Sequence, residues 1–555
     1  MSILPIRGAR HLRRFQQITR VLIRHGFGEL VDLLGATPAF PLVRILRRRP
    51  FLGPPQRLRM ALEELGPTFI KLGQILSTRP DLLPPAYIAE LSKLQDTVPP
   101  APWESVRALL EAELGTPVEE IFPTLAPEPL AAASLAQVHP ATLPDGSKVV
   151  VKVQRPNIEE TISVDLDILA DGARLLQTRT PLGEIYDLPG IVEEFSATLR
   201  AELDFYREGH NADRFRANFA GEPYLYIPKV YWDYTTRRVL VLERICGIKI
   251  DDIAALDAAG YDRYRIGLHA ARMVIKEVLE DGFFHADPHP GNFFVLPGEV
   301  IGAMDFGMVG YLSRRTRTDL IRLYIAAVQL DEEAVVDRLI RMGVVRGSVD
   351  RMGLQHDIGR LLRKYAGLPL KAIRARDVME EAMPIAFRHR LRLPSELWLL
   401  GKTLVMMEGV GLKLVPDFDM FAVSRPYVQR FLREMAAPRT WMPSLIRGVE
   451  EWAQFLEVLP RTGMQLLTRA ERGELELSLR HQELGRALIY LDRLANRLAL
   501  SILLAALIVG LALLVPAFHL AERGGLVTVL VVSGFALASL LGLWLVVSIL
   551  RSGRR

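Results

Sequence analysis

Two short polar segments on either side of an apolar run constrain the fold of this chain more than any other feature. The loop HADPHPGN occupies residues 285–292, and Asp-Phe-Gly follows at residues 305–307. Between them, FFVL and VIGAM predict two strands joined by a turn. Asn292 and Asp305 then lie at strand ends, where an amide and a carboxylate oxygen can hold Mg²⁺ together with phosphate. Asp287 can face the same cleft and accept a hydroxyl proton or orient a nucleophile.

A second constraint is a lysine inside a β-branched run. Residues 129–156 follow the pattern of strand, small-residue loop, strand, turn and strand, and Asp145-Gly146 is typical of a hairpin turn. Lys152 lies within VVVKV, and an ammonium in such a strand needs an anionic partner because an unpaired buried charge is costly. The ordered set of a strand lysine, a later helix glutamate, HxD with its asparagine, and DFG predicts a site for a nucleoside triphosphate and a divalent metal.

The rest of the body is predicted to be mainly helical. Residues 55–100 form helices broken at prolines and contain Lys71-Leu72-Gly73-Gln74, whose two polar ends share one helix face. Further along, the pattern predicts two helices over 158–220, the second carrying Glu202, Asp204 and Glu208, then two strands around a turn over 231–245, a helix over 261–283 and an all-helical region over 312–440.

Composition narrows the class of protein. Half of the 555 residues are hydrophobic and the mean hydropathy is +0.17, which excludes a disordered or collagen-like chain. The single cysteine, Cys246, excludes an internal disulfide framework and a cysteine-rich metal site. The net charge of +5 is too small to indicate a nucleic-acid partner, so none is expected.

Two long apolar stretches near the C-terminus predict a membrane hairpin. Residues 498–521 and 524–550 are 24 and 27 residues without a formal charge, and about 20 apolar residues suffice for a helix to cross the bilayer core. Arginines flank their outer ends. The positive-inside rule therefore predicts a multi-pass protein of the inner (cytoplasmic) membrane with its soluble body in the cytoplasm.

The sequence leaves two membrane contacts open. The N-terminal segment 10–30 mixes arginine with apolar residues at helical spacing, so it either lies on anionic lipid or packs its apolar face on the body. Small residues four apart in the two spans allow close contact within the hairpin or between two chains of a dimer. They are Ala506 and Gly510 in the first span, and Gly534, Ala538 and Gly542 in the second.

Together these motifs resemble the UbiB-type atypical kinases (AarF/UbiB), a protein-kinase-like family that supports ubiquinone and other isoprenoid-lipid pathways. The resemblance covers roughly residues 55–440, and the two C-terminal spans agree with bacterial members. Its motifs are KxGQ at 71–74, the Ala-rich loop at 131–134, ExD at 202–204, and the HxDPHPGN and DFG segments already described.

The resemblance implies an α+β, protein-kinase-like two-lobe fold with a helical N-terminal extension over the cleft, plus a C-terminal transmembrane helical hairpin. The expected parts are basic amphipathic N-terminal helices (1–54), a helical extension with KxGQ (55–128), an N-lobe with the Ala-rich loop and the ExD helices (129–247), a C-lobe (248–440), a helical connector (441–497) and two transmembrane helices (498–550).

The resemblance also implies roles for individual residues. Lys152 becomes the ATP lysine with Glu208 as its helix partner, and Asp287 and Lys152 become the catalytic residues. Asn292 and Asp305 are the expected metal ligands. A regulatory contact is expected between the KxGQ and ExD motifs, with Lys71 approaching Glu202 or Asp204 and with Gln74 nearby. The expected ATP-binding residues are Leu130, Ala131, Ala132, Ala133, Ser134, Leu135, Ala136, Gln137, Val138, Lys152, Glu208 and Glu243.

Three departures from ordinary protein kinases shape the expected activity. An Ala-rich loop replaces the Gly-rich one, and because alanine does not freely adopt positive φ, it should cradle phosphate less closely. The lysine usually found two residues after the catalytic aspartate is here His289, and no clear APE segment follows DFG. The last two argue against protein substrates. The expected function is a membrane-anchored atypical kinase or ATPase that uses ATP and Mg²⁺ to support ubiquinone or other prenyl-lipid biosynthesis, with prenyl-lipid intermediates and quinone-biosynthesis proteins as partners.

Two alternatives remain. The loop also resembles that of aminoglycoside- and choline-type phosphotransferases, which keep a histidine at the position of His289 but generally lack KxGQ, ExD and a membrane hairpin. The second alternative is a nucleotide-binding, non-catalytic membrane scaffold for lipid-biosynthetic enzymes, since binding and turnover use the same groups. His139, His210 and Cys246 have no companions for a metal or nucleophilic site, so each is expected to be structural.

Overall fold

The structure is a computed structural model of the whole chain, which divides into two compact units, Met1–Trp441 and Met442–Arg555. It describes residues 8–33, 52–77, 79, 82–94, 98–180, 183, 186–342, 344, 350–368, 372–389, 391, 394–419, 423–424, 426–430, 433, 502, 505–506, 509 and 533–534. Among these, no helix is both long enough and apolar enough to cross a membrane. The predicted connector at 441–497 and, apart from six isolated positions, the predicted spans at 498–550 lie outside the described residues.

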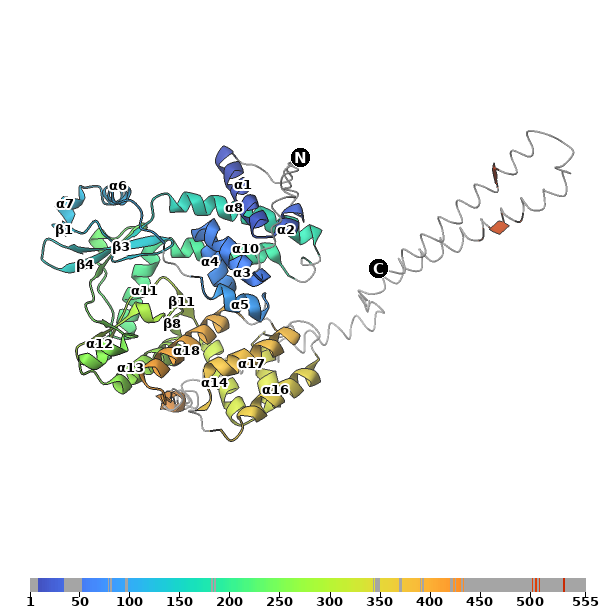
Figure 1. Cartoon of the computed structure of the whole chain (residues 1–555). Helices are drawn as coiled ribbons and strands as arrows, with labels where there is room; N and C mark the ends of the chain where they lie inside the picture. The colour runs from blue at the N-terminus through green and yellow to red at the C-terminus, as the bar shows by residue number, and fades with distance from the viewer. Residues whose placement is uncertain are drawn as a thin grey trace, which may run out of the picture. The chain divides into compact units, whose positions relative to one another are not determined.

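An antiparallel sheet forms one part of the first unit (Figure 1). Its strands run in the order β1-β3-β4-β6, with β2 pairing on β3. They are β1 (Thr124–Leu125), β2 (Ala131–Ala132), β3 (Ala136–Thr142), β4 (Lys148–Gln154) and β6 (Val239–Glu243). The predicted hairpin at 136–154 is therefore present, with Asp145-Gly146 in its turn.

The alternation of side chains along β4 gives this sheet two different faces. Val149, Val151 and Val153 are buried against the helix α6 (Trp103–Leu114), which is followed by α7 (Val118–Ile121). Val150 faces the opposite way, into the main core, and Lys152 shares its face. The β-branched run therefore builds a core on one side of the sheet and presents a cation on the other.

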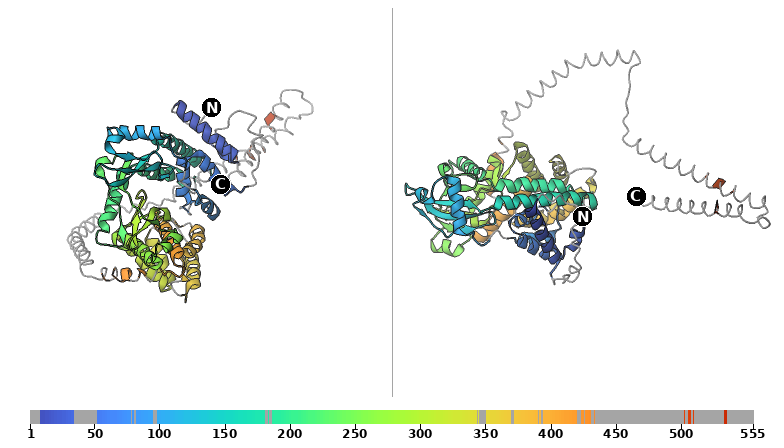
Figure 2. Two further views of the ribbon diagram at one scale, coloured as in Figure 1. Left: turned by 60° about the vertical axis from the view of Figure 1, so that its left-hand side comes forward. Right: turned by 90° about the horizontal axis from the view of Figure 1, so that it is seen from above.

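A group of helices forms the N-terminal extension beside this sheet (Figure 2). They are α1 (Ala9–Arg24), α2 (Gly28–Leu33), α3 (Pro54–Leu65), α4 (Pro67–Ser77) and α5 (Pro85–Leu91). Ile18 and Val21 bury the apolar face of α1 against α3 and against α8 (Ile158–Arg179). Of the two alternatives for this N-terminal helix, packing on the body is the one observed.

The described residues of the segment 158–218 contain three long helices, so the prediction of two is wrong. They are α8, α10 (Leu188–Glu202) and α11 (Phe205–Asn218). The helix α8 ends at Arg179, and Thr180 after it is extended because Pro181 follows and the residue before a proline disfavours helical backbone. A new helix begins at Phe205 because the side chain of Asp204 accepts the backbone N–H of Tyr206 and caps it.

A second group of elements contains another, four-stranded sheet of order β5-β10-β9-β7. Its strands are β5 (Leu225–Tyr226), β7 (Ile248–Lys249), β9 (Phe293–Leu296) and β10 (Val300–Ala303), and β8 (Phe283–His285) pairs separately with β11 (Val309–Tyr311). The helices are α12 (Ile253–Ala258), α13 (Arg263–Ile275), α14 (Arg314–Val328), α15 (Glu332–Arg341), α16 (Arg351–Tyr365), α17 (Ala375–Arg388) and α18 (Ser395–Leu414).

Three local predictions need correction. Residues 231–245 contain one strand, β6, because the segment Trp232–Tyr234 is a 3₁₀ turn. The helix predicted over 261–283 begins at Arg263, where Asp262 caps it, and continues after Ile275 as a π-helical turn to Asp281. Cys246, which was expected to be structural, lies in the short segment between β6 and β7, where it is exposed and does not pack in a core.

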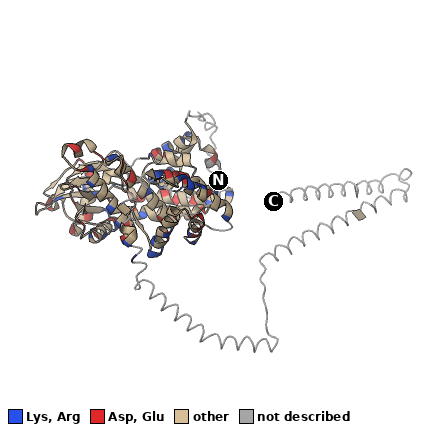
Figure 3. Cartoon of the chain, turned by 90° about the horizontal axis from the view of Figure 1, so that it is seen from below, with Lys and Arg blue, Asp and Glu red and all other residues tan. Residues whose placement is uncertain are grey.

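Charge and surface shape add two observations. Basic and acidic residues are interspersed over the described helices and strands (Figure 3), which agrees with the small net charge.

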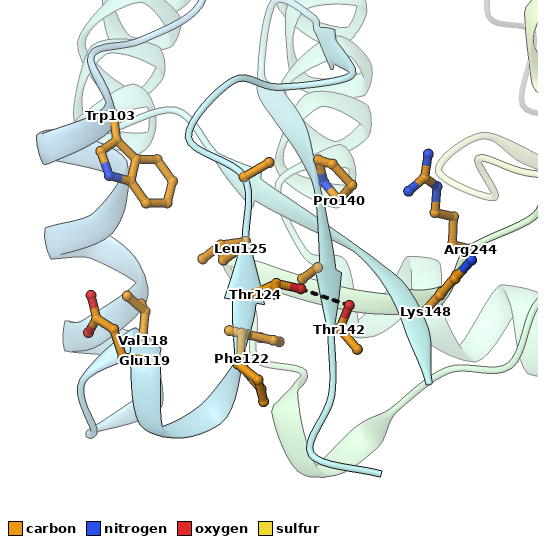
Figure 4. A pocket seen from close by; sticks show the side chains of 13 residues that line it. Trp103, Val118, Glu119, Phe122, Thr124, Leu125, Pro140, Thr142, Lys148 and Arg244 are labelled. Atoms are coloured by element: carbon orange, nitrogen blue, oxygen red, sulfur yellow. Dashed lines mark hydrogen bonds between the residues drawn. The ribbon is translucent and has the colours of Figure 1, made fainter. Parts of the chain in front are cut away.

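A cavity of about 560 Å³ opens beside β1 and β3 of the first sheet, between Trp103 of α6 and the cationic residues Lys148 and Arg244 (Figure 4). None of the residues predicted for the nucleotide site lines it.

Candidate nucleotide site

Lys152 is held between two carboxylates. Its Nζ lies 2.6 Å from Oε1 and 2.8 Å from Oε2 of Glu208, and 3.6 Å from Oδ1 of Asp305. Burial alone would lower the pKa of Lys152, but Asp305 and Glu208 outweigh it and raise the pKa above its ordinary value. The ammonium is therefore charged at any physiological pH, as a phosphate-binding lysine must be.

Glu208 lies in the first turn of α11. The residue is almost fully buried, with 4% of its surface exposed. The neighbouring Gly209 lets α11 approach Trp232, since a Cβ at this glycine would come within 2.8 Å of the indole. Further along the helix, Asn211 donates from its amide to the carbonyl oxygen of Phe306 at 3.0 Å. One helix thus fixes both the lysine partner and the backbone of the DFG segment.

Asp305 adopts a left-handed backbone conformation with φ of 61°. This conformation is uncommon for a residue with a Cβ and is found preferentially at functional sites. The Oδ1 atom of Asp305 accepts the backbone N–H of Gly307 at 3.2 Å. The nearby ammonium of Lys152 lowers the pKa of Asp305 below its ordinary value, so the carboxylate is ionised. Half of the side chain is exposed and available to a ligand.

Two hydrogen bonds to backbone carbonyl oxygens fix the loop at residues 285–292, which is called the HxDPHPGN loop or catalytic loop below. The carbonyl oxygen of Asp287 accepts from the side-chain amide of Asn292 at 3.2 Å, and the carbonyl of Asn292 accepts the N–H of Met304 at 2.8 Å. Because β9 and β10 pair in register up to Phe293 and Ala303, Asn292 lies opposite Met304, next to Asp305. The two predicted metal ligands are thus on adjacent chain segments.

The buried imidazole of His285 contacts the backbone of this loop. It is 2% exposed, and burial lowers the pKa of its imidazole, which is therefore neutral. Its Nδ1 accepts the backbone N–H of Asp287 at 3.1 Å, which leaves Nε2 to donate toward the carbonyl oxygen of Met304 at 3.5 Å. The backbone N–H of His285 donates to Oε2 of Glu277 at 3.1 Å, and burial raises the pKa of the Glu277 carboxyl group to about 8.

The donor set fits a magnesium ion that also binds phosphate. Across the described part of the chain, no group of three or more His, Cys, Asp or Glu side chains could hold a metal ion. One carboxylate and one amide, from Asp305 and Asn292, match a cation that takes few protein ligands and keeps phosphate oxygens and water. A ligand of this kind would lie next to the ammonium of Lys152.

The Ala-rich segment is a tight hairpin rather than an open loop. Ala131 and Ala132 pair with Val138 and Gln137, and the N–H of Ala133 donates to the carbonyl of Ala136 at 2.8 Å. All of residues 130–138 are described, and none of them has a positive φ. The backbone therefore lacks the left-handed turns that a close phosphate cradle uses.

Several side chains predicted to bind nucleotide are occupied elsewhere. Ser134 and Leu135 are buried, and Leu135 packs in the core between α8 and α10. Gln137 is buried, accepts the N–H of Ala101 at 2.9 Å and lies 2.7 Å from His139. Glu243 accepts from the hydroxyl of Tyr226 at 2.7 Å. On the face of the hairpin that carries Lys152 lie the side chains of Ala136 and Val138. Leu130, which directly precedes β2, is exposed.

The KxGQ and ExD motifs meet at the boundary between the extension and the body. Lys71 Nζ lies 3.1 Å from Oε2 of Glu202, the last residue of α10. Asp204 instead caps α11 and lies 3.7 Å from Arg237. Gln74 donates to the carbonyl of Leu94 at 3.2 Å, within the extension. Of the two acidic residues, Glu202 is thus the partner of Lys71.

Sequence reasoning missed one residue of this site. Lys402, on α18, donates from Nζ to Oδ1 of Asp287 at 2.8 Å. It lies in a region that was expected only to be helical, and no motif marks it in the sequence. His139 and His210 are hydrogen-bonded to the carbonyl oxygens of Ala126 and Tyr206, which agrees with the structural role expected of both residues.

Comparison with known proteins places these features in a family. The chain matches the ABC1 atypical kinase-like domain over residues 93–339, the UbiB helical domain over 358–419 and the ABC1/UbiB kinase-like C-terminal domain over 482–551. These matches confirm a kinase-like domain of mixed helices and sheets.

Individual relatives agree. The chain is 37% identical over 522 residues to a "Probable protein kinase UbiB" of Xanthomonas campestris pv. campestris, covering 90% of this chain and 93% of that one. It is 39% identical over 417 residues to a protein of the same description from Marinobacter nauticus, covering 74% and 76% of the two chains. A solved structure, of Rv3197 with erythromycin from Mycobacterium tuberculosis, is 25% identical with a TM-score of 0.47, covering 66% of this chain and 93% of that one. The family-model matches and the two curated relatives show that the chain belongs to the UbiB-type atypical kinase family.

Proposed function

We propose that this protein is a membrane-anchored atypical kinase or ATPase that uses MgATP to support the biosynthesis of ubiquinone or a related prenyl lipid. The observation that carries the proposal is the position of Lys152, whose ammonium is shared by Glu208 and Asp305 at 2.6 and 3.6 Å. A lysine held in this way binds phosphate oxygens, while the ionised Asp305 and the amide of Asn292 would hold Mg²⁺ on the same phosphates. Bound Mg²⁺ would neutralise charge on the transferred phosphoryl group.

Asp287 is the residue that meets the acceptor. It lies on the loop between β8 and β9, where it is partly exposed, with 39% of its side chain open to solvent. A carboxylate there can accept the proton of an attacking water or hydroxyl group. The hairpin at 131–138 favours a looser hold on the nucleotide than a Gly-rich loop gives. His289 in place of the usual lysine and the lack of a clear APE segment after DFG support ATP hydrolysis or transfer to a small acceptor over transfer to a protein.

The membrane part of the proposal rests on the apolar segments at 498–521 and 524–550. They would anchor the catalytic body at the cytoplasmic face of the inner membrane, close to prenyl-lipid intermediates and quinone-biosynthesis proteins. Alkaline extraction of membranes and protease protection of the C-terminus test this directly. A chain released by carbonate, or one whose soluble body is digested from the periplasmic side, would contradict it.

Nucleotide binding is tested by titrating the purified full chain with MgATP. Asp305→Asn should weaken MgATP binding at least tenfold, because it removes the carboxylate proposed as metal ligand. Asp251→Asn, which changes an exposed aspartate outside the site, is the matched control and should bind as the wild type does. Equal affinities for wild type and Asp305→Asn, or no binding by either, would refute the proposed site.

The biological role is tested by quinone profiling of a deletion strain. Complementation should be complete with the wild type and should fail with Asp305→Asn. Asp287→Asn and Lys152→Ala separate turnover from binding: a scaffold needs only the second residue, whereas a kinase or ATPase needs both. Transfer of labelled phosphate to a soluble metabolite, with normal quinone in the deletion strain, would favour the small-molecule phosphotransferase.

A further inference from the structure

A lysine from the helical region beyond the kinase-like domain reaches into the catalytic loop. Lys402 is separated from Asp287 by 115 positions, yet its Nζ donates to Oδ1 of Asp287 at 2.8 Å. The two side chains are 29% and 39% exposed, so the pair lies at the surface of the site and is open to a ligand. Lys402 falls within the UbiB helical domain match, 358–419, and outside the ABC1 match, 93–339.

The position of Lys402 is fixed by its neighbours on α18. Thr403 is fully buried and donates from its hydroxyl to the carbonyl oxygen of His285 at 3.1 Å. Four apolar side chains of α18 belong to the same core as Phe283, Phe284 and Phe306, and they follow one another at helical spacing. They are Leu400, Met407, Val410 and Leu414. This packing sets the rotation of α18 and so directs Lys402 to the loop.

The loop has no formal cation of its own. Residues 285–292 contain two histidines but neither lysine nor arginine. His285 is buried and engaged with backbone groups on both ring nitrogens, and Nδ1 of His289 accepts the N–H of Gly291 at 3.1 Å. The ammonium of Lys152 is paired with Glu208 and Asp305 rather than with Asp287. The positive charge beside Asp287 therefore comes from α18.

We propose that Lys402 is a further catalytic residue, which contacts the γ-phosphoryl group during transfer and holds Asp287 toward the acceptor. The inference rests on the proposed function. In the step, the oxygen of a water or hydroxyl acceptor forms a bond to the γ-phosphorus. The bond from phosphorus to the β,γ-bridging oxygen breaks, and ADP leaves with that electron pair. The proton of the attacking oxygen passes to Asp287.

Charge shifts during this step toward the atoms near Lys402. In a loose transition state, negative charge is spread over the equatorial and bridging oxygens, and a preplaced cation stabilises it more than it stabilises bound ATP. Loss of such a group lowers kcat and leaves ground-state binding nearly unchanged. By analogy with removal of one donor from an oxyanion site, we expect a fall in kcat of roughly 100-fold.

The test uses the purified full chain in detergent or lipid, with MgATP as the probe. Lys402→Met removes the ammonium and keeps the aliphatic stem, and Lys402→Arg keeps the charge. Lys413→Met is the matched control, since this lysine is exposed on the same helix. We expect kcat to fall about 100-fold in Lys402→Met, to be partly retained in Lys402→Arg and to be unchanged in Lys413→Met. The Kd for MgATP should stay within about threefold throughout.

The possible results separate this inference from the proposed function. Turnover by Lys402→Met within threefold of wild type would overturn the catalytic role and leave the proposed function standing. Faster turnover would overturn it as well, because Lys402 would then restrain Asp287. Wild-type protein that fails to bind MgATP, or that binds it without turnover, would overturn both. If the melting temperature of Lys402→Met is lower than that of Lys413→Met, wild type is compared with Lys402→Arg instead. In that comparison, a fall in kcat matched by an equal loss of MgATP affinity would refute the catalytic role.

Discussion

The contact between Lys152 and Glu208 is best tested by a double-mutant cycle. The pair is 18% and 4% exposed and is joined by two short contacts of 2.6 and 2.8 Å. Glu208→Gln keeps the shape of the side chain but removes its charge, and Lys152→Met keeps the stem and removes the ammonium. Together with the double variant they give the free energy of interaction, provided that each change removes the contact without making a new one.

The structure sets the expected size of each step. Glu208→Gln should lower the free energy of unfolding by about 2 kcal/mol, because a hydrogen bond to a charged group is worth roughly 1.5–3 kcal/mol and Asp305 still partners the ammonium. Lys152→Met should cost about 3 kcal/mol, since it leaves the buried carboxylate of Glu208 without its cation. The double variant should also cost about 3 kcal/mol, so the coupling energy is about 2 kcal/mol.

Urea unfolding of the full chain, followed by tryptophan fluorescence and far-ultraviolet circular dichroism, measures these values. Trp232 is a suitable reporter because it packs over Gly209, the residue after Glu208. MgATP titration of the same variants shows whether the pair also orders the nucleotide site. Additive losses, with a coupling energy below about 0.5 kcal/mol, would show that the contact makes no specific contribution and would refute the reasoning.

Two further predictions concern packing and pH. Gly73→Val should destabilise the extension by about 1–3 kcal/mol, because even its Cβ would lie 2.3 Å from Leu94 and 2.8 Å from Leu62; limited proteolysis and thermal melting would show it, and an unchanged melting temperature would contradict it. The lowered pKa of Asp305 means that its contact with Lys152 stabilises the fold above the ordinary aspartate value of 3.8 and ceases to do so as the pH falls through the lower, folded-state pKa. Lys152→Met should therefore move the midpoint of acid unfolding to higher pH, and an unshifted midpoint would argue against the contact.

Local patterns were sufficient to predict the centre of the site. Lys152 follows from a β-branched strand, and Asn292 and Asp305 follow from two polar segments that bracket a hairpin. In each case the residues that position the side chain are its neighbours in the chain, so periodicity and turn chemistry carry the information. The mixed helix-and-sheet, kinase-like domain was predictable from the same motifs.

The parts that were missed depend on contacts between distant segments. Lys402 approaches Asp287 only because apolar residues of α18 pack in the core around Phe283 and Phe306, and no local signal distinguishes it from other helix lysines. The division between α10 and α11 was missed because it depends on a cap at Asp204 within an otherwise helical pattern. The contacts of the Gln137 side chain with Ala101 and His139 likewise join segments that no local pattern connects.

The junction between α10 and α11 has a mechanical consequence. Glu202 forms an ion pair with Lys71 of the extension, and Glu208, six positions later, forms one with Lys152. Leu203 is the C-terminal cap of α10 and Asp204 is the N-terminal cap of α11, so only these two residues connect the two helices that carry the ion pairs. We therefore expect an outward displacement of α4 either to break the Lys71–Glu202 ion pair or to move Glu208, and with it the ammonium of Lys152.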